Sequence, residues 1–289
     1  MIPICDLHTH SYYSDGTYSP TQLIKAAEKE GLSAIALCDH NTVAGLPEFL
    51  AAAENCNVEA VPGIEFTTDY RGTELHILAL YIKKKHYPAI TELLQDFRLH
   101  KERSNIELVA RLRQAGLNID YDSIKAAAKD GYVNRAHIAA ELVCNGYTES
   151  VKDGFQKYLS VGGGFYTPPQ QLDAFEVIRF IKSIGAAAVL AHPFLNLNEE
   201  QMRVFLPLAK AHGLDAMETL YTKYDEETTN IAAKIAEEFG LEKSGGSDFH
   251  GDNKPGVRLG CGTGNLLIPL RFLEIIKKRV STSRGASIE

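Results

Sequence analysis

The feature of this chain that most constrains its fold is an alternation of short apolar runs with segments of helical periodicity. The apolar runs that predict strands lie at residues 2–8, 32–40, 58–66, 74–82, 186–193, 214–220 and 241–251. The predicted helices lie between them, at residues 19–31, 44–56, 173–185, 199–213 and 225–240. Alternation of this kind predicts an α/β fold built from βα units around a mainly parallel sheet.

The middle of the chain departs from this alternation. From about Tyr87 to Tyr166 the pattern is mostly helical, and it closes in the glycine-rich stretch 160–169. We therefore expect a helical module inserted into the βα-repeat fold. The predicted division is a barrel formed by residues 1–86 and 167–289, with residues 87–166 as the insertion.

Histidines and carboxylates follow the predicted strands where the strands end. His8 and His10 close the first strand two residues apart, so their side chains point to the same face. Four further strand ends carry Asp39 with His40, Glu65, His192, and Asp248 with His250. Because active sites of βα barrels form at the C-terminal ends of the strands, we expect these groups to gather at one rim.

This mixture of imidazoles and carboxylates is typical of sites for Mn²⁺, Fe²⁺ or Zn²⁺. Asp15 can fold back over the rim from the loop after the first strand, whereas the position of His76 at the start of its run leaves its direction open. One zinc ion needs roughly four ligands, so we expect two or three divalent ions, with Mn²⁺ first and Fe or Zn as alternatives. The candidate ligands are His8, His10, Asp15, His40, Glu65, His76, His192, Asp248 and His250.

Composition excludes several classes of protein. The formal net charge of −7 argues against an extended nucleic-acid surface, although ions at a metal site can still attract a small anionic substrate. No apolar stretch approaches the roughly 20 residues of a membrane span, and no signal peptide is evident, so we expect no membrane partner and a cytoplasmic location. The five cysteines are scattered without a CxxC pair, which argues against a disulfide framework or a thiolate zinc site.

The order of the motifs makes the pattern specific. The stretches DLHTHSYYSDGTYSP, ALCDHNTVAG, GIEF, LHILAL, AHP and GSDFHG occur in the order seen in the PHP (polymerase and histidinol phosphatase) family. The chain resembles that family from residue 6 to residue 251. The resemblance implies a distorted (β/α)7 barrel, similar to a TIM barrel, with metal-dependent phosphoesterase activity.

The resemblance also implies how the ligands divide among three ions. The implied sites are His8, His10, Asp248 and Glu65 for the first ion, Glu65, His76 and His192 for the second, and Asp15, His40 and His250 for the third. Asp6 and Asp39 are implied to orient imidazoles from outside the ligand set.

Two further features point to a subgroup of the family. Asp15 stands where members of the histidinol phosphatase type often have a histidine, which favours the subgroup with a helical insertion, similar to nucleotide phosphoesterases. The stretch GYVNRAHIAAEL resembles the Arg-x-His motif of that subgroup. Arg135 is then implied to grip a phosphate as a bidentate donor, and His137 to contact the phosphate or donate a proton. The alternative for both residues is a solvated helix face.

We therefore expect a phosphoric ester hydrolase in which a hydroxide between two ions, about 3.5–4 Å apart, attacks phosphorus. The first expected substrate is the 3′-phosphate of nucleoside 3′,5′-bisphosphates. A 5′→3′ exonuclease on very short RNA is the closest alternative, because both reactions present a terminal nucleotide phosphate to the same ions. We expect the insertion to cap the site, where its aromatic residues could stack a base or belong to the core; these are Phe155, Tyr158, Phe165 and Tyr166.

Three other functions stay open at this point. Histidinol phosphate phosphatase is disfavoured by Asp15 and by the insertion. A non-catalytic PHP module, as occurs within polymerases, often loses ligands, whereas this chain lacks none that we can identify. A metal-dependent amidohydrolase on a related barrel would cleave C–N bonds, and no lysine is placed to bridge its ions.

Overall fold

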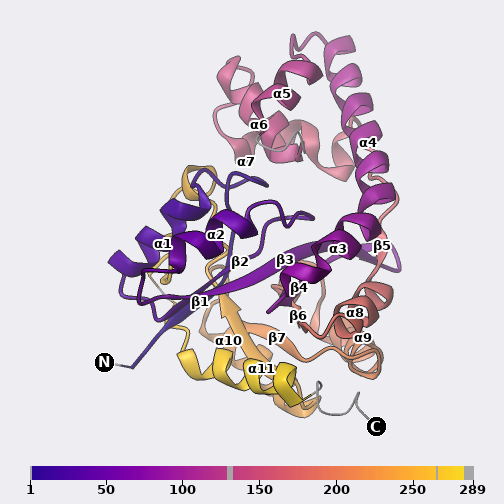
Figure 1. Cartoon of the computed structure of the whole chain (residues 1–289). Helices are drawn as coiled ribbons and strands as arrows, with labels where there is room; N and C mark the ends of the chain where they lie inside the picture. Colours follow the sequence, from indigo (N-terminus) through magenta and orange to yellow (C-terminus); the bar gives the residue numbers. More distant parts are fainter. Residues whose placement is uncertain (1, 129–132, 265, 283–289) are drawn as a thin grey trace.

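The computed structural model describes residues 2–128, 133–264 and 266–282, whose strands form a single curved sheet (Figure 1). Each predicted apolar run forms one of its strands. The strands are β1 (Cys5–Thr9), β2 (Ala34–Leu37), β3 (Glu59–Tyr70), β4 (Thr73–Leu80), β5 (Leu172–Asp173), β6 (Ala187–Leu190), β7 (Ala216–Tyr221) and β8 (Glu242–Gly246).

The sheet is a nearly closed barrel with one reversed strand. Its strands follow the order β1-β2-β3-β4-β6-β7-β8, and β5 pairs with the end of β3. Neighbours are parallel except that β4 runs antiparallel to both β3 and β6. Backbone hydrogen bonds of 2.9 Å from Asp248 N–H to His8 O and from His10 N–H to Phe249 O bring the two ends of the sheet together.

Helices cover the outer face of the barrel. They are α1 (Pro20–Lys29), α2 (Leu46–Ala53), α8 (Ala174–Ser183), α9 (Glu199–Ala211) and α10 (Glu226–Glu238). The start of α1 illustrates how the sequence fixes these elements, since the Ser19 side chain accepts a hydrogen bond from Gln22 N–H and Pro20 is the first helical residue. The apolar faces of these helices bury one large cluster against the sheet.

A second apolar cluster fills the inside of the barrel. It includes Val61 of β3, which points to the same face as Glu65 four residues later. Leu273 and Ile276 of α11 (Leu270–Thr282) belong to this cluster, so α11 packs against the inside of the barrel. The α11 helix, which the sequence analysis did not predict, lies on the side of the barrel away from the helices of residues 87–154 (Figure 1).

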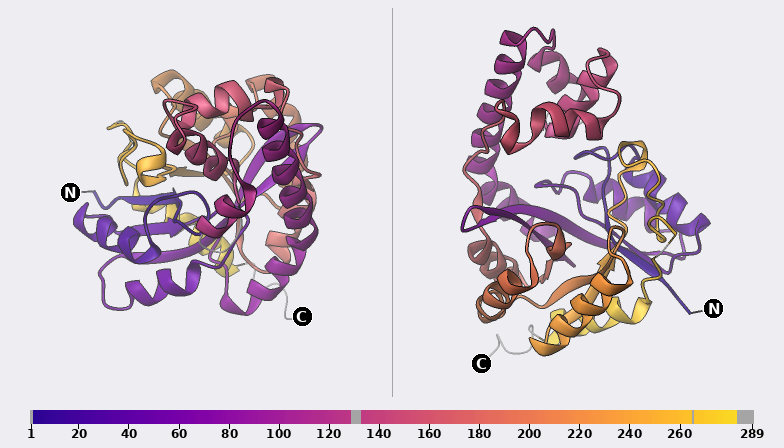
Figure 2. Two further views of the ribbon diagram at one scale, coloured as in Figure 1. Left: turned by 90° about the horizontal axis from the view of Figure 1, so that it is seen from above. Right: turned by 180° about the vertical axis from the view of Figure 1, so that it is seen from behind.

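The chain between β4 and β5 is helical; its beginning, with Ile90 and Phe97, packs in the large cluster outside the barrel, and the rest forms a helical layer of its own. Its helices are α3 (Tyr87–Leu93), α4 (Gln95–Gln114), α5 (Tyr121–Ala127), α6 (Arg135–Cys144) and α7 (Val151–Gly154), followed by a π-helical turn (Phe155–Leu159). Leu112, Ile124 and Ile138 lie in a separate apolar core within this layer. Figure 1 and the right-hand view of Figure 2 show α4 extending away from the barrel and α5 to α7 standing over one rim.

The prediction of an α/β barrel of the distorted TIM-like type is confirmed, with β4 as the source of the distortion. The domain boundaries at residues 86/87 and 166/167 stay a prediction. Across the residues that the structure describes, no helix is both long enough and apolar enough to span a lipid bilayer. The cytoplasmic location stays a prediction.

Candidate metal centre

Glu65, in β3, is fully buried at the centre of a cluster of histidines. The imidazole nitrogens nearest to its Oε2 are Nε2 of His8 at 3.2 Å, Nε2 of His10 at 3.2 Å and Nδ1 of His40 at 3.1 Å. Those nearest to its Oε1 are Nδ1 of His76 at 2.8 Å and Nε2 of His192 at 3.1 Å. One carboxylate therefore meets five imidazoles, which arrive from β1, β2, β4 and β6.

The reversed direction of β4 explains why His76 belongs to this cluster. His76 lies near the start of β4, opposite Thr67 near the end of β3. Because the two strands are antiparallel, the beginning of one shares the rim with the end of the other. In the sequence, His76 stands at the start of its apolar run, which left its direction open. In an antiparallel strand, a residue at that position lies at the rim.

A second group of carboxylates lies beside Glu65. Asp15 Oδ1 is 3.2 Å from Nε2 of His250, and its Oδ2 is 3.7 Å from Nε2 of His40. Asp248 Oδ1 is 3.3 Å from Nε2 of His10 and 3.4 Å from Nδ1 of His250. The structure thus gathers all nine predicted ligand residues into one continuous cluster, which we call the metal-ligand cluster.

The donor atoms of this cluster fit divalent cations. In the part of the chain that the structure describes, His8 Nε2, His10 Nε2 and Glu65 Oε2 are buried without a hydrogen-bond partner. Such atoms destabilise a fold unless something binds them, and imidazole and carboxylate are suitable ligands for Mn²⁺, Fe²⁺ and Zn²⁺. The donor atoms form three sets, and within each set all of them lie within 4.8 Å of one another. The sets are His8, His10 and Glu65; His40, Glu65 and His76; and His10, Asp15, His40 and His250.

These sets share Glu65, His10 and His40, whereas the resemblance implied that His40 serves the third ion alone. Glu65 joins two of the sets, as expected of a bridging ligand. The division of the nine residues among ions stays a prediction.

The charges around the cluster also favour a cation. Burial opposes a charge on the His10 ring, but the nearby carboxylates of Asp248 and Glu65 outweigh it and raise the pKa of His10 to about 9. Burial also opposes a charge on the His76 ring, but the Glu65 carboxylate outweighs this effect and raises the pKa of His76 to about 10. The carboxylates that hold protons on these rings would attract a divalent cation to the same place.

Strand β7 supplies no predicted ligand, yet two of its residues hold the ligands in place. Both oxygens of Glu218, which is fully buried, accept hydrogen bonds: Oε1 from His8 Nδ1 at 3.0 Å and Oε2 from His192 N–H at 2.6 Å. The Tyr221 hydroxyl donates to Asp248 Oδ2 at 2.7 Å. Sequence reasoning missed Glu218, although a glutamate in the middle of the predicted strand 214–220 was a usable signal.

The contacts of Asp6 and Asp39 show which donors these carboxylates satisfy, and their implied role in orienting imidazoles stays a prediction. Asp6 accepts hydrogen bonds from Ser247 N–H at 2.9 Å and from Gly260 N–H at 2.8 Å. Asp39 accepts from the backbone and hydroxyl of Ser11 and from the Ser14 hydroxyl, each at 2.7 Å. These carboxylates therefore satisfy donors of the rim loops, and Glu218 lies beside His8.

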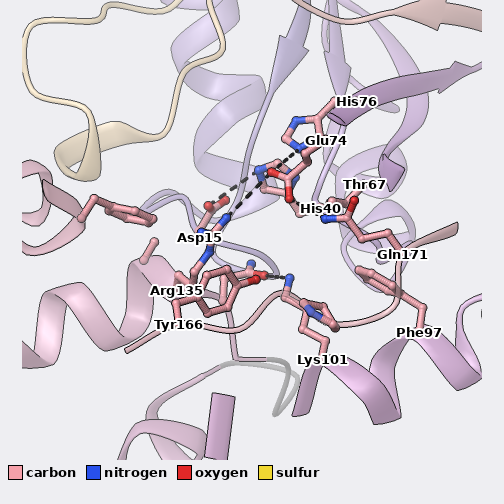
Figure 3. Close-up of a pocket in the computed structure, with 14 residues that line it drawn as sticks. Asp15, His40, Thr67, Glu74, His76, Phe97, Lys101, Arg135, Tyr166 and Gln171 are labelled. Carbon is pink, nitrogen blue, oxygen red and sulfur yellow. Dashed lines mark hydrogen bonds and ion pairs between the residues drawn. The ribbon is translucent and has the colours of Figure 1, made fainter. Parts of the chain in front are cut away.

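A cavity of about 150 Å³ lies between the metal-ligand cluster and the helical layer (Figure 3). Asp15, His40 and His76 line it on the barrel side. Lys101 of α4 and Arg135 at the start of α6 line it on the other side. The predicted metal ligands and two basic side chains thus share one small cavity.

The two basic groups are held by different contacts. The Arg135 guanidinium lies over the Tyr166 ring at 4.3 Å from its centroid, and its Nη2 is 3.8 Å from Glu74 Oε1. The Lys101 ammonium donates a hydrogen bond to Asn134. Burial, and then repulsion from Arg135, lowers the pKa of Lys101 to about 8. Two cations that repel each other on the same side of a cavity are arranged to receive an anion.

The structure does not bring His137 to this cavity. Its Nδ1 accepts a hydrogen bond of 3.0 Å from Asn134 N–H, at the beginning of α6, and it is not one of the lining residues. Its predicted contact with phosphate stays a prediction. All four aromatic residues pack in or against the core of the helical layer, where Tyr158 and Phe165 contact each other. Phe155 and Tyr166 also line the cavity.

Comparisons with known proteins identify relatives of this chain. The family model of the PHP domain matches residues 6–167. A 5′-3′ exoribonuclease of Haemophilus influenzae is 37% identical over 246 residues, which cover 85% of this chain and 89% of the relative. A 3′,5′-nucleoside bisphosphate phosphatase of Chromobacterium violaceum is 28% identical over 257 residues, covering 88% and 90% of the two chains.

Two solved structures have a similar fold over nearly the whole chain. A candidate metal-dependent phosphoesterase from Bifidobacterium adolescentis superposes with a TM-score of 0.85 at 31% identity, covering 95% of this chain and 96% of the other. An amidohydrolase from C. violaceum with bound sulfate superposes with a TM-score of 0.84 at 26% identity over the same shares. With the family match over more than half of its length, the chain belongs to the PHP family and is a metal-dependent phosphoesterase.

Proposed function

We propose that this enzyme hydrolyses the ester bond to the 3′-oxygen of a 5′-phosphorylated nucleotide. When the 3′-substituent is a lone phosphate, the substrate is a nucleoside 3′,5′-bisphosphate and the products are a nucleoside 5′-phosphate and inorganic phosphate. When a further nucleotide follows, the same bond cleavage removes one 5′-nucleotide from a short RNA. The two relatives, named as an exoribonuclease and a bisphosphate phosphatase, support a bond that both reactions share.

The observation that carries this proposal is the pairing of two kinds of group in one cavity. Asp15, His40 and His76 line one side, and Lys101 and Arg135 line the other (Figure 3). A nucleotide with two phosphates can place one phosphate against each side. A substrate with a single phosphate would leave one side without an anion, and this difference is the basis of the test below.

The chain's own residues have separate tasks in this reaction. We assign Arg135 and Lys101 to the 5′-phosphate, where the planar guanidinium can donate two parallel hydrogen bonds. The nine metal-ligand residues would hold two or three divalent ions, which lower the pKa of a water and neutralise the phosphate being attacked. Water oxygen then bonds to phosphorus and gives up a proton, the bond from phosphorus to the 3′-oxygen breaks, and that oxygen takes up a proton. Glu218 and Tyr221 keep the ligands in position.

The test is a panel of substrates with Mn²⁺ supplied. It contains adenosine 3′,5′-bisphosphate, a 5′-phosphorylated dinucleotide, the same dinucleotide without its 5′-phosphate, and histidinol phosphate. Inorganic phosphate is measured for the monoesters, and chromatography measures the mononucleotides released from the dinucleotides. The His8→Ala variant serves as the control, because it removes one metal ligand.

We expect hydrolysis of the bisphosphate and of the 5′-phosphorylated dinucleotide, at least about tenfold slower cleavage without the 5′-phosphate, and no activity in the control. Equal rates with and without the 5′-phosphate would contradict the assignment of Lys101 and Arg135. Hydrolysis of histidinol phosphate alone would replace the proposed substrate class.

A further inference from the structure

Glu74 is an acidic residue that lines the cavity to which the proposed function assigns two phosphates. It stands two residues before His76 in β4, so both side chains point to the same face of the strand. Both line the cavity, together with Arg135 (Figure 3). The Glu74 side chain is 35% exposed. A carboxylate in this place repels phosphate, so it needs a role that outweighs this cost.

The structure holds Glu74 in place from two directions. Its Oε2 accepts a hydrogen bond of 2.7 Å from Gln171 Nε2, and its backbone carbonyl accepts one of 2.7 Å from Asn196 Nδ2. Gln171 directly precedes β5, where the chain returns from the helical layer, and Asn196 follows β6. One carboxylate oxygen and the backbone of Glu74 are therefore fixed by contacts within the protein.

The other carboxylate oxygen has only longer contacts with the groups around it. Glu74 Oε1 is 3.5 Å from Nε2 of His76 and 3.8 Å from Nη2 of Arg135. Both distances exceed the about 2.7–3.2 Å of an N–H···O hydrogen bond. Oε1 thus lies near both a predicted metal ligand and the arginine assigned to the 5′-phosphate. An ionised carboxylate can only accept hydrogen bonds, so this oxygen can receive a donor from a substrate.

The proposed substrate brings one suitable donor to this place. Its 5′-phosphate is assigned to Arg135 and its 3′-phosphate to the metal-ligand cluster, so the ribose that joins them passes beside Glu74. Because the 3′- and 5′-oxygens of that ribose are both esterified, the 2′-hydroxyl is the only O–H donor of the sugar. A 2′-deoxyribose has no such donor.

We infer that Glu74 accepts a hydrogen bond from the 2′-hydroxyl and makes this enzyme selective for ribonucleotides over deoxyribonucleotides. This inference rests on the proposed function and deepens it by naming the sugar. Hydrogen bonds to an ionised group are about twice as strong as those between neutral groups. A deoxynucleotide would cover the carboxylate and give it no donor, which costs binding free energy. The 2′-hydroxyl is also the group by which proteins distinguish RNA from DNA.

The test compares adenosine 3′,5′-bisphosphate with its 2′-deoxy counterpart, in the wild type and in the Glu74→Ala variant, with Mn²⁺ supplied. The readout is the ratio of the two kcat/KM values within each protein, which we call the ribose preference. Removing the 2′-oxygen also changes the chemistry of the leaving 3′-oxygen, but this contribution is common to every variant and cancels when the ratios are compared.

A second readout does not depend on hydrolysis. The affinities of adenosine 5′-phosphate and 2′-deoxyadenosine 5′-phosphate are measured by calorimetry with the chelator-treated protein. These nucleotides keep the 5′-phosphate and differ only at the 2′-position, so their affinity ratio should change with the ribose preference.

We expect the ribose preference to fall about ten- to hundredfold in Glu74→Ala, as for the loss of a hydrogen bond to a charged group. Glu74→Gln, which keeps the size of the side chain, should lower the preference less, because its oxygen is a neutral acceptor. The matched control is Lys101→Met, which changes another residue of the same cavity. It should slow both bisphosphates by a similar factor and keep the wild-type ribose preference.

The remaining outcomes separate this inference from the proposed function. A Glu74→Ala variant that is slower with both bisphosphates but keeps the wild-type ribose preference would mean that Glu74 only positions His76 and Arg135. That result, or equal kcat/KM values for both bisphosphates in the wild type, would overturn the inference and leave the proposed function standing. Hydrolysis of neither bisphosphate by the wild type would refute the proposed function, while the two nucleotide affinities would still decide whether Glu74 recognises the 2′-hydroxyl.

Discussion

Glu218, which is not a predicted ligand, positions two residues that are. For Nε2 of His8 to offer a lone pair to a metal, the proton of the neutral ring must be on Nδ1, and Glu218 Oε1 lies 3.0 Å from that nitrogen. The other oxygen of the same carboxylate accepts the backbone N–H of His192, whose φ of 29° is strained for a residue other than glycine. One side chain thus orients one ligand and supports the backbone of another.

Replacing Glu218 with glutamine should therefore weaken metal binding without unfolding the protein. The amide can offer only one oxygen, so its NH₂ group must face either His8 Nδ1 or the His192 N–H. We expect a loss of about 10–100-fold in Mn²⁺ affinity, measured by calorimetry, with a parallel loss in kcat/KM. The exposed Glu227→Gln substitution in α10 is the control. A wild-type affinity for Mn²⁺ in the Glu218 variant would disprove this role.

At the scale of the elements, the contact between β8 and β1 closes the barrel beside the site. Gly246, the last residue of β8, lies so close to β1 that an added Cβ would stand 2.1 Å from His8 Cβ and 2.9 Å from His8 N. Both of these atoms belong to a fully buried residue, which has little room to move. The absence of a side chain at this position lets the two strands approach.

The Gly246→Ala substitution should destabilise the protein by about 1–3 kcal/mol, the usual effect of overpacking, and displace His8 from the cluster. Urea denaturation measures the first effect and Mn²⁺ affinity the second. Gly162→Ala is the matched control, because an added Cβ there meets no atom within 4 Å and the backbone needs no positive φ. A Gly246 variant as stable and as tight in metal binding as the control would show that the strands can separate freely.

For the molecule as a whole, the metal-ligand cluster couples folding to metal binding. Its ligands come from strands at both ends of the sheet order, so the cluster exists only when the barrel is assembled. A cation that binds the folded state alone stabilises it by mass action. The buried atoms that lack hydrogen bonds, such as His10 Nε2, would gain their partner at the same time.

Mn²⁺ at 100 times its dissociation constant should therefore stabilise the fold by about 2.7 kcal/mol. Differential scanning calorimetry of the chelator-treated protein, with and without Mn²⁺, measures this effect. Ca²⁺, which prefers oxygen ligands, should produce a smaller shift. An unchanged Tm on addition of Mn²⁺ would mean that the cluster is held together without a cation.

Local pattern was enough to predict most strands and helices of the barrel and to single out the candidate ligand residues. The alternation of strands and helices, the capping serine at position 19 and the imidazoles at strand ends are all readable within a few neighbouring residues. Because parallel strands of a βα barrel end at one rim, local positions such as His8 and His192 translated into a shared site. The ordered motifs then pointed to the PHP family.

Tertiary structure alone decided what depends on contacts between distant segments. The reversal of β4 brings His76 to the rim, and the pairing of β7 with β8 sets Glu218 beside His8; neither follows from local periodicity, because strand direction and neighbours are set by the whole barrel. The same holds for Lys101, which is one more lysine on a helix until folding turns it toward Arg135. By itself the sequence determined which groups carry the chemistry, and the fold decided which of them meet, because burial and charge act through space.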